Sequence, residues 1–315
     1  MKLLLFGDDF RLGVLNAQSQ VVDVSDIVKD IPHQDPQGLI SGLIQRFDQY
    51  KPRLQQAASS SQGKPVDSVR IRPPLPHPAN IICMAVNYME DGTRSEPAPI
   101  NAFMKSPSSV IGPGDTMVLP DVAATIFEGE AELAVVIGKR ASRVPASEAM
   151  NYIFGYTNFI DGSARGMQPA AQSFYQMKSR DTFAPIGPYL VTADEIADPH
   201  KVAIKLSNNG TVYQNFNSDD MAHKIPRCIE WVTSIHALEP GDILATGTNH
   251  RGLNPFMDGD VIEIECQGLG RLRINVRDDL HRTWARETRL QRQEKGLDGT
   301  TPQLTGKYAE AAVAR

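Results

Sequence analysis

Residues 127–139 read FEGEAELAVVIGK. Beyond the acids, both faces of an extended chain here carry only Ala, Leu, Val or Ile, because alternate side chains point to opposite faces. Strands that are apolar on both faces lie inside a sheet. The stretch therefore predicts a central, buried strand, with Glu130 and Glu132 on one shared face near its beginning.

These two glutamates need a compensating positive charge. Two carboxylates in a buried strand cost on the order of several kcal/mol unless a cation lies beside them or one of them is protonated. Either a metal ion or ion pairs with Lys or Arg would supply that charge, and the pair alone leaves both readings open. Because the neighbouring sequence offers no His or Cys, an ion here would be Mg²⁺, Mn²⁺ or Ca²⁺ rather than zinc.

A second Glu-x-Glu pair has a different meaning. Around Glu263 and Glu265, apolar residues occupy only the opposite face of the strand, so we interpret these two acids as solvent-exposed. The pair belongs to residues 259–276, in which apolar and polar residues alternate on both sides of residues 267–270. That pattern predicts a β-hairpin.

The chain as a whole predicts an α+β fold that is mostly β. Short apolar runs separated by Gly and Pro follow one another through residues 81–276, and helical spacing interrupts them at 146–154 and 226–236. No period repeats along the sequence, which argues against a solenoid or a propeller.

The N-terminal part has its own pattern. Residues 2–6 and 12–24 predict short strands. A helix follows, with Asp35 as its N-cap and Pro36 in its first turn. A polar stretch at 55–64 then predicts a linker.

We divide the chain on this basis. Residues 281–295 predict a basic surface helix, and the Gly, Thr and Pro residues after it predict a poorly ordered tail. The predicted parts are a small N-terminal α/β domain at 1–75, a catalytic domain at 76–280, and a C-terminal helix and flexible tail at 281–315.

The composition is that of an ordinary globular protein. Of 315 residues, 41% are hydrophobic and 22% are charged, with a formal net charge of −5. This balance favours neither nucleic acid nor a membrane as a partner.

The apolar run at residues 3–6 is too short for a signal-peptide core or a membrane span, so we expect a cytoplasmic protein. The three cysteines are isolated and indicate neither disulfides nor a zinc site.

A family resemblance covers about residues 81–276. Residues 155–168, GYTNFIDGSARGMQ, taken with residues 127–139, resemble the fumarylacetoacetate hydrolase family. Further motifs follow in the family's order: KSRDTFAPIGPYLVT at 178–192, VYQNFNSDDM at 212–221 and LEPGDILATGT at 238–248. The resemblance implies a mixed β-sandwich roll with a small N-terminal domain. It also implies a homodimer, since relatives are commonly dimers.

The resemblance supplies a third metal ligand. In that family the Glu-x-Glu pair and an Asp in the Asp-x-Ser-Ala-Arg segment bind a divalent ion, which implies Glu130, Glu132 and Asp161 here. The implied ion is Mg²⁺, with Mn²⁺ or Ca²⁺ as alternatives. Lys178 and Arg165 match positions around the substrate, where they would hold developing negative charge. The residues assigned to substrate binding are Tyr88, Gln168, Thr248 and Asn249.

The water-activating histidine of the family is missing. Hydrolytic members have a His three residues after the Tyr of an Asn-Tyr pair, where it works with a Glu; this chain has Asp91 there. Glu90, Asp91 and Glu96 are therefore candidate bases, although each also fits a solvated loop. A further candidate is His250, in a segment where many relatives have Pro and this chain has Asn249 and His250.

Three functions stay open on these grounds. The first is hydrolysis of a carbon–carbon bond in an acylpyruvate-like or diketo acid through a metal-bound enolate, as in aromatic compound catabolism. The second is a non-hydrolytic isomerase, tautomerase, decarboxylase or dehydratase acting on a 2-oxo or hydroxy-diene acid, which the absent histidine favours. The third is a non-catalytic protein that binds a small oxo acid.

Overall fold

The strand predicted at residues 127–139 is confirmed as β10 (Ile126–Ile137), and all of its residues are buried. It pairs in an antiparallel manner with β11 (Ile153–Arg165), also buried over most of its length. In this register Glu130 lies directly opposite Asp161. The computed structural model describes residues 1–169, 174–297 and 299–309.

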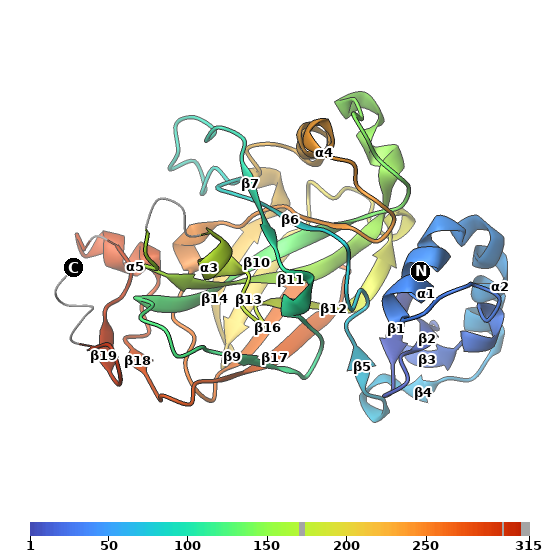
Figure 1. The fold of residues 1–315 in the computed structure, drawn as a ribbon, viewed down its shortest axis with the longest axis horizontal. Helices are drawn as coiled ribbons and strands as arrows, with labels where there is room; N and C mark the ends of the chain where they lie inside the picture. The colour runs from blue at the N-terminus through green and yellow to red at the C-terminus, as the bar shows by residue number, and fades with distance from the viewer. Residues whose placement is uncertain (170–173, 298, 310–315) are drawn as a thin grey trace.

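This pair lies in the middle of the larger of two main sheets (Figure 1). Within the described residues, the larger sheet has 12 strands, in the order β4-β3-β2-β1-β12-β11-β10-β15-β6-β7, with β5 beside β1 and β8 beside β12. The smaller sheet has the order β14-β13-β16-β17-β9. The strands of the body not yet bounded are β6 (Ile81–Met84), β7 (Ala102–Lys105), β8 (Val110–Ile111), β9 (Thr116–Val118), β12 (Ala184–Thr192), β13 (Ala203–Asn208), β14 (Thr211–Asn217), β15 (Ile243–Ala245), β16 (Val261–Cys266) and β17 (Arg271–Arg277).

The main core lies between the two sheets. Leu133 and Val135 of β10 belong to the same buried cluster as Ile264 of the smaller sheet. Ala134 and Val136, on the other face of β10, belong to a second cluster that includes residues of the N-terminal part. Glu130 and Glu132 continue this second face, because side chains alternate along a strand.

Helices are few in the body. Of the segment predicted as helical at 146–154, Ala146–Tyr152 forms a 3-10 helix and the last two residues begin β11. The segment predicted at 226–236 is α4 (Ile225–Ile235). A short helix, α3 (Phe174–Lys178), lies near β7 and β11. The predicted hairpin at 259–276 is confirmed as β16 and β17.

The N-terminal part joins the larger sheet. Leu3 lies opposite Leu190, so β1 extends the sheet past β12. The second buried cluster contains residues from both sides of residue 75, the predicted domain boundary. The division at that residue stays a prediction. The elements of this part are β1 (Lys2–Phe6), β2 (Arg11–Leu15), β3 (Gln20–Asp23), α1 (Pro36–Gln45), α2 (Phe47–Ser60), β4 (Lys64–Pro65) and β5 (Ile71–Arg72).

Local predictions for this part are confirmed in one place and wrong in another. The Asp35 carboxylate accepts a hydrogen bond from the Gly38 backbone N–H at 2.7 Å, which confirms the N-cap. The predicted linker at 55–64 is wrong for its first six residues, because α2 continues to Ser60. Buried Leu54 and Tyr50 on this helix supply tertiary packing that the polar composition hides.

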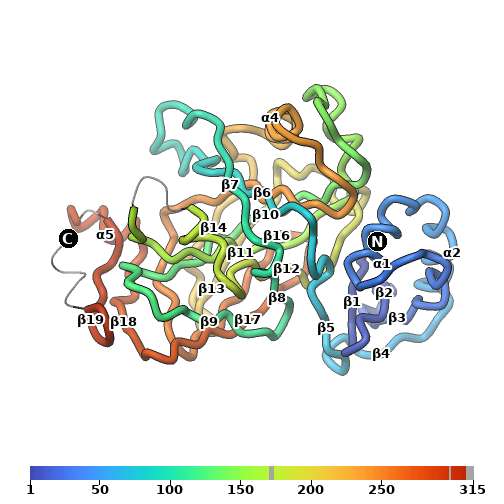
Figure 2. The backbone as a smooth tube through the Cα atoms, in the orientation of Figure 1, coloured from blue at the N-terminus to red at the C-terminus, as the bar shows by residue number. Residues whose placement is uncertain are grey.

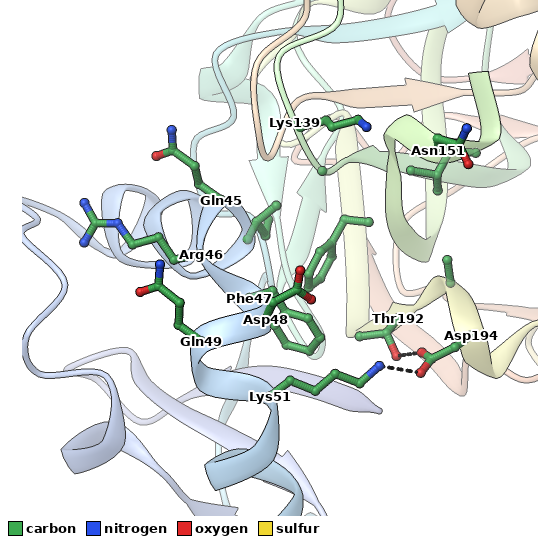
Figure 3. Close-up of a pocket in the computed structure, with 15 residues that line it drawn as sticks. Gln45, Arg46, Phe47, Asp48, Gln49, Lys51, Lys139, Asn151, Thr192 and Asp194 are labelled. Carbon is green, nitrogen blue, oxygen red and sulfur yellow. Dashed lines mark hydrogen bonds and ion pairs between the residues drawn. The ribbon is translucent and has the colours of Figure 1, made fainter. Parts of the chain in front are cut away.

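A cavity of about 500 Å³ separates the α1–α2 corner from the body (Figure 3). Across it, Lys51 Nζ lies 2.9 Å from Asp194 Oδ2, and the Thr192 hydroxyl donates to the same carboxylate. Phe47 packs edge-on against Phe154, with ring centroids 4.8 Å apart. These contacts connect the N-terminal part to the body beside the β1–β12 pairing.

The C-terminal segment lies at the opposite end of the molecule from the N-terminal part (Figure 2). The surface helix predicted over 281–295 is wrong for its first half: α5 spans only Arg289–Glu294, and Arg282 and Trp284 are buried. Their side chains dock on Phe127, which explains the burial. A short strand pair, β18 (Thr283–Trp284) and β19 (Gln303–Thr305), completes the segment. The end of the predicted tail, 310–315, lies outside the described residues.

None of the helices in the described parts of the chain has the length and apolar character needed to cross a membrane.

Candidate metal centre

Three carboxylates meet where β10 and β11 pair. Glu130, Glu132 and Asp161 each offer an oxygen, and these oxygens all lie within 4.8 Å of one another. The strand alternation places the two glutamates on one face, and the register places Asp161 opposite Glu130. All three side chains are buried. The grouping that the family resemblance implied is therefore present, and it could hold a divalent ion.

Glycines fix the strand and the loop around the carboxylates. A Cβ at Gly129 would lie 2.4 Å from the Phe256 ring, so only glycine allows that ring to pack beneath β10. Gly247, with a φ of +87°, donates its backbone N–H to Glu132 Oε2 at 2.7 Å. That positive φ suits glycine and directs the amide at the carboxylate.

Cationic side chains surround two of the three carboxylates. Lys105 Nζ lies 2.5 Å from Asp161 Oδ1, and Lys178 pairs with the other oxygen of Asp161. Lys178 Nζ also lies 3.0 Å from Glu130 Oε1, which in addition pairs with Arg165. Ion pairs therefore neutralise Glu130, as one of the two readings of the buried glutamates expects, and they neutralise Asp161 as well.

Glu132 differs from its neighbours. Among the described residues no Lys or Arg pairs with it, its side chain is fully buried, and its Oε1 has no hydrogen-bond partner. Burial, and then the charges of Asp161 and Glu130, raise the pKa of Glu132 well above its usual range. Burial also acts on Glu130, but Lys178 and Arg165 outweigh it and hold the pKa of Glu130 well below the usual range.

The residues fit a divalent ion. A buried carboxylate oxygen with no partner, next to two further carboxylates, is the donor set that hard cations such as Mg²⁺ and Mn²⁺ prefer. A cation beside Glu132 would supply the charge that the neighbouring lysines do not give it.

A small cavity of about 60 Å³ opens beside the carboxylates. Its charged and polar lining consists of Glu130, Arg165, Lys178, Thr248 and His250, five residues that sequence reasoning placed at the site. The remaining lining is apolar and consists of Met84, Ala85, Val86, Phe103 and Phe174. The cavity thus joins a charged floor to an apolar wall.

Two of the proposed bases contact each other. His250 Nδ1 lies 2.8 Å from Glu90 Oε1, and both side chains are largely buried. Although burial raises the pKa of Glu90, its bonds to His250 and Arg94 outweigh that effect and lower it. A carboxylate in this position holds the imidazole so that Nε2 is free to accept a proton.

Asp91 and Asn249 lie beside a different cavity from His250 and Glu130. Asp91 Oδ2 accepts hydrogen bonds from Arg251 at 2.9 Å and from the Asn249 amide at 3.3 Å. Both residues line a neighbouring cavity of about 180 Å³. Asp91, which the resemblance assigns to the family's histidine position, therefore pairs with an arginine in the structure. Glu96, on the same loop, is exposed.

Two further residues assigned to substrate binding lie away from the small cavity. Tyr88 is buried and packs edge-on against Phe216, with ring centroids 5.1 Å apart. Gln168 is exposed, and its backbone carbonyl accepts a hydrogen bond from Gln176. Their roles in substrate binding stay predictions.

Sequence reasoning missed several residues at the site. Glu128 lies on the same face of the strand as Glu130 and Glu132, and this alternation is the signal that marks it. Arg165 Nε lies 3.0 Å from its carboxylate. Gln214 donates to the Thr248 hydroxyl at 2.9 Å, and nothing in its sequence context marks that role. Lys105 pairs with Asp161 and is buried, but no local sequence pattern indicates that this lysine is buried.

Comparison with known families identifies the family of this chain. The family described as fumarylacetoacetate (FAA) hydrolase C-terminal matches residues 80–277, more than half of the chain. The chain belongs to the fumarylacetoacetate hydrolase family. Its matched region contains β10, β11 and the carboxylates.

Individual members of the family are similar over most of this chain. A maleylpyruvate hydrolase from Sphingobium sp. SYK-6, solved in complex with manganese(II) and pyruvate, has a TM-score of 0.79 at 32% identity and covers 88% of this chain and 99% of its own. Maleylpyruvate hydrolase from Aquipseudomonas alcaligenes is 31% identical over 293 residues, 88% of this chain and 99% of that protein. The mitochondrial oxaloacetate tautomerase Fahd2a of Rattus norvegicus is 37% identical over 218 residues, 65% of this chain and 69% of that protein.

These relatives confirm the predicted fold class, a mostly β mixed fold with few helices. They also show that members of the fumarylacetoacetate hydrolase family are enzymes acting on small acids, by hydrolysis in some and by tautomerisation in others.

Proposed function

We propose that this protein is a divalent-metal-dependent hydrolase that cleaves a carbon–carbon bond in an acylpyruvate-like or diketo acid. The observation that carries the proposal is the small cavity itself. It brings Glu130 of the carboxylate group, the cations Lys178 and Arg165, and His250 with its Glu90 partner to one place. The similar maleylpyruvate hydrolase solved with manganese(II) and pyruvate supports this assignment.

Glu130, Glu132 and Asp161 would hold the ion, which we propose to be Mg²⁺, with Mn²⁺ or Ca²⁺ as alternatives. When bound, such an ion supplies a Lewis acid that polarises the oxo group of a 2-oxo acid. Lys178 and Arg165 line the same cavity and would stabilise negative charge as it develops on substrate oxygens. The homodimer implied by the family is a separate prediction, which sedimentation equilibrium tests.

His250 would be the general base for the water. With Nδ1–H donated to Glu90, Nε2 takes a proton from water while the water oxygen bonds to the distal carbonyl carbon of the substrate. The carbon–carbon bond then breaks, and its electron pair passes to the carbon next to the oxo group as an enolate. Return of the proton to that carbon yields a 2-oxo acid and a second carboxylic acid, so atoms and charge balance.

The apolar wall suits the hydrocarbon part of such a substrate. Phe103 and Phe174 stack with ring centroids 4.9 Å apart and an angle of 5°, and Met84 and Val86 line the same cavity. The acyl group would lie against these side chains while the 2-oxo acid faces the carboxylates and the cations.

A second candidate function is tautomerisation or isomerisation of a 2-oxo or hydroxy-diene acid. The observation in its favour is that Asp91, at the family's histidine position, pairs with Arg251. Proton transfer by His250 then suffices, with no attack by water. The similar oxaloacetate tautomerase supports this candidate.

One experiment separates the two functions. The protein, loaded with Mg²⁺ or Mn²⁺, is incubated in D₂O with a panel of acylpyruvates, and products are followed by NMR and mass spectrometry. Hydrolysis predicts two shorter acids. Deuterium incorporation into intact substrate would support the second candidate. Oxaloacetate is tested alongside the acylpyruvates, and if every one of these compounds stays unchanged, both candidates are contradicted.

A further inference from the structure

The C-terminal segment reaches the candidate active site through one arginine. Arg289 begins α5, and its Nη2 lies 2.6 Å from Glu128 Oε2, while its Nε lies 3.3 Å from Glu128 Oε1. Glu128 is only 2% exposed. The family match ends at residue 277, so Arg289 lies outside the matched region, whereas Glu128 lies inside it.

Glu128 is shared by two arginines. Arg165 Nε lies 3.0 Å from the same Oε2 that Arg289 contacts, and the far end of Arg165 pairs with Glu130. Arg165 therefore lies between two carboxylates, Glu128 behind it and Glu130 in the cavity. The position of its guanidinium depends on how strongly each carboxylate attracts it.

Arg289 offsets the pull of Glu128. The Arg289 and Arg165 guanidiniums both pair with the buried Glu128 carboxylate, so each cation takes only part of its attraction. If Arg289 were absent, Arg165 would be the remaining described cation on a buried anion. An uncompensated buried carboxylate attracts its remaining partner strongly. Arg165 would then be drawn away from the cavity.

The segment that carries Arg289 is firmly anchored. The Arg282 guanidinium is fully buried, pairs with Asp278 at 2.8 Å and donates to the Pro120 and Val122 carbonyls. Trp284 Nε1 donates to the Thr125 carbonyl at 2.8 Å, one residue before β10 begins.

The first turn of α5 is fixed as well. Thr288 and Gln291 form a capping box at its start. The Arg289 backbone N–H donates to the Leu253 carbonyl at 3.1 Å, and the Leu253 N–H donates to the His250 carbonyl at 3.1 Å. The segment thus contacts both sides of the site, the strand with Glu128 and the loop with His250.

We propose that Arg289 is a positioning residue that keeps the Arg165 guanidinium in the cavity by sharing Glu128 with it. The C-terminal segment thereby helps to position a side chain of the candidate active site. The inference rests on the proposed function, because Arg165 is taken to hold an anionic substrate there.

The test measures binding rather than turnover. Oxalate, a dianion with the shape of a 2-oxo acid enolate, serves as the probe, and its affinity is measured by calorimetry for the full-length, Mn²⁺-loaded protein. Arg289→Ala should weaken oxalate binding by about tenfold or more, as is typical when a partner of a site residue is removed. Arg289→Lys should restore part of that loss, and the Kd for Mn²⁺ should change much less.

Arg286→Ala is the matched control. Arg286 belongs to the same segment and also pairs with a buried carboxylate, Asp260, but it does not contact Glu128 in the described structure. Its loss should lower the free energy of unfolding without the loss of oxalate affinity. If both alanine variants weaken oxalate equally, the contact is merely structural and the proposal is wrong.

A double variant sharpens the result. Glu128→Gln removes the charge that would draw Arg165 away, so Glu128→Gln combined with Arg289→Ala should bind oxalate more tightly than Arg289→Ala alone. Absence of any such recovery in a folded double variant would contradict the mechanism. Failure of the wild-type protein to bind oxalate with Mn²⁺ would instead contradict the proposed function, so the two failures are distinguishable.

Discussion

Glu130 lies directly opposite Asp161 across the pairing of β10 and β11, and Glu132 follows on the same face two positions later. The three carboxylates thus come from two adjacent strands of one sheet. Their geometry is set by strand register rather than by loops. Register in a sheet buried on both faces is strongly specified, so the relative placement of these carboxylates is strongly specified as well.

We expect Glu132→Gln to abolish ion binding while leaving the metal-free protein at least as stable. The pKa of Glu132 is raised, so its ionised form is disfavoured in the folded state and lowers stability at neutral pH. In wild type, Mg²⁺ or Mn²⁺ at a hundred times its Kd should raise the free energy of unfolding by about 2.7 kcal/mol. The variant should lose this increase.

Calorimetry and urea unfolding with and without the ion measure both effects. Glu265→Gln, in the second Glu-x-Glu pair, is the control, because Glu265 is exposed and pairs with Arg271 at the surface. Wild-type ion affinity in Glu132→Gln would contradict the assignment.

His250→Ala should lower kcat by about 10² to 10⁴-fold, the usual contribution of a general base. Glu90→Gln should lower kcat less, since it removes the charge that orients the imidazole but keeps a hydrogen-bonding group. Asp91→Asn should have the smallest effect, because Asp91 pairs with Arg251. Steady-state kinetics on the substrate found in the acylpyruvate panel rank the three variants. A larger loss for Asp91→Asn than for His250→Ala would assign the base to Asp91.

Lys105→Met should tighten ion binding and destabilise the ion-free protein. Lys105 is buried and lies 2.5 Å from Asp161 Oδ1, so its removal leaves a buried carboxylate with one cation fewer. Breaking a buried pair in this way costs about 3–5 kcal/mol. The ion then meets one fewer repelling charge.

Urea unfolding should therefore show a larger recovery with Mn²⁺ for Lys105→Met than for wild type. Lys201→Met is the control, because Lys201 pairs with Asp198 at an exposed position. A folded Lys105→Met variant that binds Mn²⁺ more weakly than wild type would refute the electrostatic argument.

Asp194 gives the N-terminal junction a dependence on pH. Its bonds to the Thr192 hydroxyl and the Lys51 ammonium lower the pKa of Asp194 to about 2. A depressed carboxylate pKa contributes stability that is fully present above the ordinary value near 3.8 and is lost as pH falls toward 2. Because the pair is half exposed, its contribution is below about 1 kcal/mol.

Urea unfolding of wild type and Asp194→Asn should accordingly show a small, constant gap between about pH 7 and pH 5 that narrows as pH falls through about 3.5. Addition of salt should shrink the gap at neutral pH. A gap that widens on acidification would rule out this role for Asp194.

Much of the fold follows from local pattern in the sequence. The two apolar faces of residues 127–139 predicted β10, and the alternation at 259–276 predicted the hairpin, because strand periodicity is a property of neighbouring residues. The end of α2 and the burial of Arg282 and Trp284 escaped prediction. Tertiary packing overrides a polar or basic local composition in both places.

In the candidate site, too, some residues follow from local sequence pattern and others do not. Glu130 and Glu132 follow from alternation, whereas Asp161 required the family resemblance because it lies on another strand. The contact between His250 and Glu90 joins residues 160 positions apart, and no local pattern encodes it. Long side chains such as Arg289 reach their partners only after the loops are placed.

The pairing of β1 with β12 has a consequence for how the enzyme forms. Leu3 meets Leu190, and β12 is hydrogen-bonded on its other edge to β11, which carries Asp161. Pairings between such distant segments close slowly, because a long loop must be ordered before any contact forms. β5 covers this edge of β1 at Leu5 and Phe6, but the edge at Lys2 and Leu3 stays unpaired until β12 has been synthesised. A nascent chain stalled before that point would be a target for chaperones or for aggregation.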